Sequence, residues 1–170
     1  MAAPMDSTVE TELEVARISA GANLRAGIFA GLCGAVVMGL FSMSYSALVG
    51  GLGFYLPLRE VAAAVVGVGA LVGGGGTIVT GAAIHLGVGM AFGAFFAWVL
   101  DRAAGPGTGV VLGILYAGVI LGVMTYFTLH FLDPVMAARV QLVPLAWVST
   151  HLLFGIVLGG LTPVFRRAFV

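Results

Sequence analysis

Residues 78–100 read IVTGAAIHLGVGMAFGAFFAWVL, an apolar stretch that contains no charged side chain. A helix needs about 20 such residues to cross the hydrocarbon core of a bilayer, which is about 30 Å thick. Asp101 and Arg102 follow the stretch directly, where a spanning helix would reach the polar headgroups. The stretch therefore predicts a transmembrane helix.

Three further stretches have the length and composition of a membrane span, at about residues 26–49, 110–132 and 144–165. Pro144 suits the first turn of a helix, where its missing N–H has no helical acceptor to serve. Asp133-Pro134 is typical of a helix stop. We therefore predict an all-α polytopic membrane protein, with four transmembrane helices in an up-down bundle.

The composition of the whole chain supports this prediction. Of its 170 residues, 61% are hydrophobic and 8% are charged, whereas a soluble domain is about 25% charged. The formal net charge is zero, which gives no reason to expect a nucleic-acid partner. Known catalytic motifs are absent from the sequence, and we do not expect an enzyme.

The rest of the chain divides into a tail and one connecting segment. Residues 1–22 are polar and acidic, which predicts a mostly disordered cytoplasmic tail before a membrane domain at 23–170. Residues 57–72 begin with Arg59 and Glu60, expected to form an ion pair with each other or to contact headgroups, and continue as a short apolar run. We predict an interfacial or re-entrant helix there, and a fifth span is the alternative.

The arginines predict an orientation. With four spans, both termini and the loop after the second span share one side of the membrane. That side carries five arginines, Arg17, Arg25, Arg102, Arg166 and Arg167, and the other side carries Arg59 and Arg139. Positive residues concentrate in the cytoplasm, so we expect both termini there and the chain in the inner (plasma) membrane as a multi-pass protein.

Histidine and glycine recur at one spacing in the second and fourth predicted spans. The pattern is H-x3-G-x3-G in both, as His85, Gly89, Gly93 and as His151, Gly155, Gly159. The first and third spans share a looser pattern if one residue is inserted, with Gly27, Gly31, Gly39 against Gly109, Gly113, Gly122. The patterns favour two parallel helix hairpins that arose from one. Small residues four apart also let helices pack closely in lipid.

The histidines are the candidate site residues. His85 and His151 each lie seven residues after the expected start of their spans, at a depth of about 10 Å. Facing each other across a bundle, they could be the axial ligands of a haem b. Together with His130, at the end of the third span, they could bind a copper or zinc ion or relay protons. The simpler interpretation is that each forms a hydrogen bond within the bundle.

Two classes of function remain open on the sequence alone. The favoured one is a structural or accessory subunit of a larger membrane assembly, such as a respiratory or photosynthetic one. The alternative is a small membrane protein that binds haem or a metal through His85 and His151. A small permease is a weaker third reading. The expected partners are the lipid bilayer and other membrane subunits or further copies of the chain.

Overall fold

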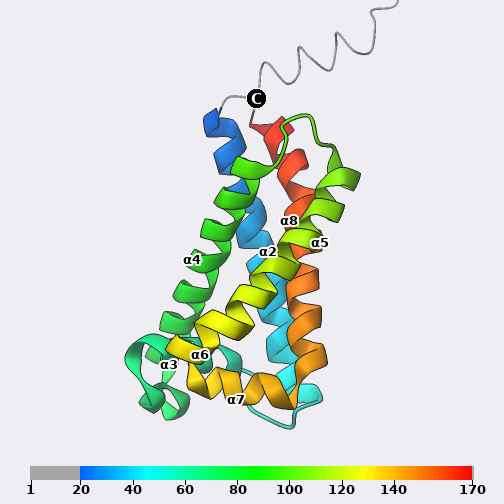
Figure 1. Cartoon of the computed structure of the whole chain (residues 1–170). Coiled ribbons are helices and arrows are strands. Elements are labelled where there is room, and N and C mark those ends of the chain that lie inside the picture. Colours follow the sequence, from blue (N-terminus) through cyan, green and yellow to red (C-terminus); the bar gives the residue numbers. More distant parts are fainter. Residues whose placement is uncertain (1–19, 170) are drawn as a thin grey trace, which may run out of the picture.

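Four long apolar helices form the body of the protein (Figure 1). The computed structural model describes residues 20–169, apart from the side chain of Thr128. Within this range the helices long enough to cross a membrane are α2 (Ala20–Leu48), α4 (Gly75–Val99), the continuous run that starts with α5 (Pro106–Val123), and α8 (Pro144–Ala168). The prediction of an all-α, four-helix, multi-pass membrane protein is confirmed.

The helices start earlier or end later than the hydropathy indicates. α2 begins at Ala20, six residues before the expected start of the first span, and α8 continues to Ala168. Residues 1–19 of the expected tail lie outside the described residues, and Ala20–Ala22 are already helical. Helix formation therefore extends beyond the uncharged stretches and includes Arg25 and Arg166, at the ends of the bundle.

The third span is not a regular α-helix. α5 is followed by the π-helix η2 (Met124–Thr128) and then by the short α6 (Leu129–Leu132). A π-turn widens the helix and leaves room for contacts that a regular turn would not make. One such contact is the hydrogen bond from Trp147 Nε1 to Thr125 Oγ1, 2.8 Å long, which joins α8 to η2.

Shorter helices cover the end of the bundle opposite the C-terminus (Figure 1). They are α3 (Leu56–Val66), the 3-10 helix η1 (Val68–Val72) and α7 (Pro134–Leu142). α3 packs against α4, where the Leu58 carbonyl lies against Gly81. α3 has only 11 residues, too few to cross a bilayer, so the fifth span does not form.

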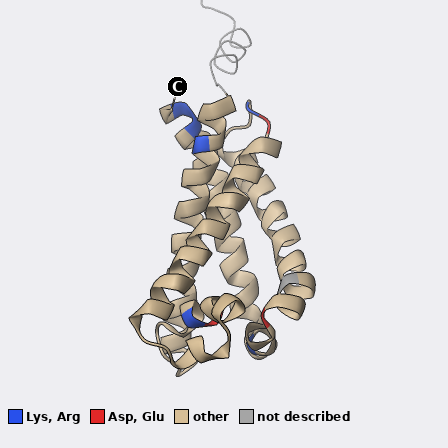
Figure 2. Cartoon of the chain, turned by 90° about the vertical axis from the view of Figure 1, so that its left-hand side faces the viewer, with Lys and Arg blue, Asp and Glu red and all other residues tan. Residues whose placement is uncertain are grey.

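The charges of the described residues lie at the two ends of the bundle, and the middle carries none (Figure 2). One end, called the terminal end because the C-terminus lies there, holds Arg25, Asp101, Arg102, Arg166 and Arg167. The opposite end, called the α3–α7 end, holds Arg59, Glu60, Asp133 and Arg139. Such an uncharged belt matches the hydrocarbon layer of a bilayer.

The repeated glycines make the same contact in both hairpins. In the first hairpin, Gly27 and Gly31 of α2 lie against Gly93 and Gly89 of α4. In the second, Gly109 and Gly113 of α5 lie against Gly159 and Gly155 of α8. At each of these glycines an added Cβ would overlap a backbone oxygen or a side-chain Cβ of the partner helix. Descent of the two hairpins from one remains a prediction, but their packing is equivalent.

Pro163 leaves a backbone oxygen of α8 free for the contact with α5 in the second hairpin. Pro163 lies inside α8 and has no N–H to donate to the carbonyl oxygen of Gly159, four residues earlier. That oxygen lies against Gly109, where a Cβ would overlap it. The Cα–H of Gly109 faces the freed oxygen, and such contacts stabilise helix pairs by about 0.5–1 kcal/mol each.

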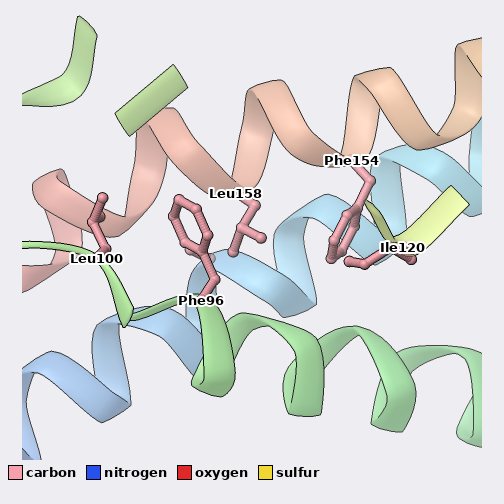
Figure 3. Packing of buried hydrophobic residues seen from close by; sticks show 6 residues of the cluster. Phe96, Leu100, Ile120, Phe154 and Leu158 are labelled. Carbon is pink, nitrogen blue, oxygen red and sulfur yellow. The ribbon is translucent and has the colours of Figure 1, made fainter. Parts of the chain in front are cut away.

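The two hairpins join through α2 and α8 and through an aromatic seam. Phe96 and Leu100 of the first hairpin pack with Ile120, Phe154 and Leu158 of the second (Figure 3). The remaining member of this buried cluster is Ala30 of α2. α4 and α5 meet where the Tyr116 hydroxyl donates to the Phe92 carbonyl over 3.0 Å and its ring packs on Phe96.

Candidate ligand site

A cavity of about 330 Å³ lies between the spans and the short helices of the α3–α7 end. Its walls are mostly apolar and come from every long helix as well as from α3 and α7. The polar side chains in its lining are Ser42, Tyr45, Glu60, His85, Asp133, Arg139, Trp147, Thr150 and His151. Two of the three candidate histidines therefore face one common space.

His85 reaches across from α4 to α2. Its Nε2 atom lies 2.9 Å from the carbonyl oxygen of Ala35. Gly39, one turn further along α2, gives the ring room, because a Cβ there would lie 3.3 Å from Nε2. α4 begins at Gly75, so His85 lies about 15 Å below the start of its helix, deeper than the sequence suggested.

His151 is held within its own helix. Its Nδ1 atom lies 2.9 Å from the Trp147 carbonyl oxygen, and its ring packs edge-on against the Trp147 indole with a centroid distance of 4.3 Å. The residue is 3% exposed. His85 and His151 line the same cavity, and their role as ligands of a cofactor or metal remains a prediction.

The carbonyl partners define which ring nitrogen carries the hydrogen. A carbonyl oxygen only accepts, so His85 must donate through Nε2 and His151 through Nδ1. In a neutral imidazole the other nitrogen is then an acceptor. Among the described residues neither Nδ1 of His85 nor Nε2 of His151 has a hydrogen-bond partner. Both histidines line the cavity, and each keeps one acceptor nitrogen without a partner among the described residues.

His130 does not belong to this site. It lies on α6 with an exposed side chain, its ring contacts the Phe131 ring, and it is not part of the cavity lining. In the part of the chain that the structure describes, no group of three or more His, Cys, Asp and Glu side chains is placed to hold one metal ion. The structure therefore does not bring the three predicted metal ligands together.

An ion pair closes the α3–α7 end of the cavity. Arg139 of α7 binds the Glu60 carboxylate of α3. The sequence had predicted that Glu60 pairs with its neighbour Arg59 or contacts headgroups, but in the structure its partner lies on another helix. Asp133 begins α7, and its Oδ1 accepts from the Met136 N–H over 2.9 Å. Burial raises the pKa of Glu60 although Arg139 opposes the shift, and burial also raises the pKa of Asp133.

No protein family, curated protein or solved structure matches the chain. The site is therefore interpreted from its own geometry.

Some apolar residues of the cavity lining are also exposed on the outside of the bundle. Val88 of α4 and Leu132 of α6 line the cavity and are also 37% and 63% exposed. Closer to the terminal end, Tyr116 of α5 contacts α4 through a hydrogen bond to the Phe92 carbonyl and a ring contact with Phe95. In a bilayer the exposed sides of Val88 and Leu132 would face the acyl chains.

Sequence reasoning did not place Glu60 or Arg139 in the candidate site. Both line the cavity, but Glu60 was expected to pair with Arg59 or to contact headgroups, and Arg139 lies in the segment between the third and fourth spans. A usable signal was the Asp133-Pro134 pair, since an N-cap followed by proline also starts a helix. The pairing of Glu60 with Arg139 had no signal, because 79 residues separate them.

Proposed function

We propose that the protein binds a small molecule in the cavity between its spans, with His85 and His151 as the polar contacts. The observation that carries this proposal is the shared cavity. Ligand sites are concave and mostly apolar, with a few polar groups that orient the ligand. Polar groups at membrane depth usually face such a space and mark a functional site.

A cavity-filling variant tests the proposal. Ala146 lines the cavity and is buried, so Ala146→Phe places a ring in the space that a ligand would occupy. Both proteins are purified in detergent, and the small molecules that remain bound are extracted and identified by mass spectrometry. We expect a molecule in about one-to-one amount with the wild type and its loss from the variant. The same bound molecules in both would contradict the proposal.

The haem and metal hypotheses are special cases of this proposal. An iron or another metal ion would use the ring nitrogens that the two carbonyls leave unbound. The absorption spectrum and metal content of the same preparations test them. A Soret band or a stoichiometric metal that Ala146→Phe removes would identify the ligand as that group. The absence of both would leave an organic ligand.

The role of accessory subunit remains a prediction. The exposed apolar side chains of the spans are accounted for by lipid, so they do not by themselves favour a protein partner. A permease role also remains a prediction, and it needs the same cavity with a second opening. Purification of the chain alone or with other subunits separates the accessory role from the binding role.

A further inference from the structure

We infer that the ligand is a lipid-soluble molecule with hydroxyl donors, which reaches the cavity from the bilayer between α4 and α6. This inference rests on the proposed function and adds the chemistry of the ligand and its route. Three features of the cavity carry it: the acceptor nitrogens of His85 and His151, the mostly apolar lining, and the exposed apolar side chains of Val88 and Leu132 in that lining.

The acceptor nitrogens select a donor on the ligand. Nδ1 of His85 and Nε2 of His151 accept while their rings are neutral, because the opposite nitrogens donate to Ala35 and Trp147. Two further donors of the lining are already used within the protein, as Thr150 Oγ1 donates to the Trp147 carbonyl and Trp147 Nε1 donates to Thr125. A hydroxyl or phenol group on the ligand would satisfy the histidines.

The other polar groups of the lining are compatible with such a ligand. The hydroxyls of Ser42 and Tyr45 can rotate to donate or to accept, so they favour neither polarity. Glu60 and Arg139 form an ion pair, and Asp133 caps α7 without a cationic partner among the described residues. An anionic ligand would therefore meet a second carboxylate in a mostly apolar space, which is unfavourable.

The route follows from the walls. Ile84 and Val88 of α4 line the cavity, as do Met124, Leu129 and Leu132 of the third span, and all five side chains are apolar. Val88 and Leu132 are also exposed on the outside of the bundle, where lipid would surround them. A molecule that dissolves in the acyl chains would enter between these apolar side chains.

Fluorescence of Trp147 measures binding directly, because this indole lines the cavity. Trp98 is the other tryptophan and is 75% exposed on the surface of α4, so Trp98→Phe leaves Trp147 as the single reporter. The probes are a hydroquinone with a decyl tail and its dimethyl ether, which has the same apolar body without donors. Quenching is titrated anaerobically with the full chain in lipid nanodiscs.

We expect the hydroquinone to bind about tenfold more tightly than the ether, the difference expected when buried acceptors are left without a donor. His85→Phe and His151→Phe in the Trp98→Phe background keep a ring and remove the nitrogens, and each should bring the two affinities together. Should His151→Phe not fold, His85→Phe alone carries this comparison. Ala146→Phe should weaken both probes equally.

Equal affinities of the two probes for the parent would overturn the inference, as would a preference that survives both histidine substitutions. If both probes bind equally and Ala146→Phe still weakens them, the binding cavity stands and only the donor requirement is lost. If neither probe quenches Trp147, the inference is overturned, while the molecules retained on purification still decide the proposed function.

Discussion

Single glycines decide how closely the spans approach. Gly113 of α5 lies against the backbone of α8, where an added Cβ would overlap the Gly155 carbonyl. Gly118, five residues later on the same helix, has nothing within 4 Å of such a Cβ. Both sit in the same apolar stretch, so hydropathy alone does not distinguish them. A comparison of substitutions at the two positions therefore distinguishes the effect of close helix packing from the effect of the low helix propensity of glycine.

We predict that Gly113→Ala destabilises the protein and Gly118→Ala does not. The first substitution forces α5 and α8 apart, at a cost of about 1–3 kcal/mol typical of an overpacked core. The second only replaces glycine by a better helix former. Denaturant unfolding in mixed micelles, followed by circular dichroism, compares the two. Equal destabilisation by both would show that the close contact between Gly113 and Gly155 is not important for stability.

Histidine chemistry at the residue scale was partly predictable. The shared H-x3-G-x3-G spacing suggested related positions for His85 and His151, and both residues line one cavity, but their role as ligands remains a prediction. The hydrogen bonds differ, however, since His85 donates to α2 and His151 donates within α8. Spacing along one helix does not encode which carbonyl a side chain reaches.

Among the elements, α3 and α7 differ most from what hydropathy suggests. Each begins at a proline or has one in its first turn, and neither is long enough to span a bilayer. They meet through Glu60 and Arg139 at the end of the cavity. The ion pair joins two helices that also pack directly against each other.

We predict that this contact makes stability depend on pH. Folding raises the pKa of Glu60 above its ordinary value of 4.5, because burial outweighs the attraction of Arg139, and the pKa of nearby Asp133 is also raised. The folded state therefore holds protons more tightly than the unfolded state. The stabilisation from protonation is complete below pH 4.5 for Glu60 and is lost as pH rises through the folded pKa.

The measurement is the thermal unfolding midpoint in detergent as a function of pH. The wild-type midpoint should fall as pH rises above 4.5, and Glu60→Gln should flatten this fall. Asp133→Asn is the matched variant, since asparagine also caps a helix and its effect isolates the second carboxyl. A midpoint that rises over this range, or an unchanged slope in Glu60→Gln, would show that the assigned sign is wrong.

For the whole molecule, the two charged ends define the membrane axis. The terminal end carries four of the described arginines, Arg25, Arg102, Arg166 and Arg167, and the α3–α7 end carries Arg59 and Arg139. This bias favours the terminal end in the cytoplasm, which would place the cavity in the outer half of the bilayer. The orientation and the kind of membrane remain predictions.

Reporter fusions test this orientation. A fluorescent protein that folds only in the cytoplasm, fused after Val170, should be fluorescent in bacterial cells. Alkaline phosphatase fused at the same position should be inactive, because it needs the oxidising periplasm. The control is each reporter inserted after Gly69, within η1 at the α3–α7 end, where the activities should be reversed. A phosphatase-active C-terminal fusion would invert the proposed topology.

The sequence by itself determined the medium and the class of fold. Long uncharged stretches such as residues 78–100 can satisfy their backbone only as helices in lipid, and this requirement is local. Four spans were predicted from these stretches, but the alternative of a fifth span at 57–72 was excluded only by the structure, where α3 has 11 residues. The medium and the class of fold depend on the residues of single segments.

Only the tertiary structure decided the site. Its features depend on side chains from separate helices. They are the cavity itself, the presence of His85 and His151 in its lining, the position of His130 outside it, and the ion pair of Glu60 with Arg139. The insertion of the π-turn at Met124–Thr128 likewise rotates the end of the third span relative to its start. In lipid, helix contacts depend on shape and hydrogen bonds and not on burial from water, so hydropathy carries no information about which faces meet.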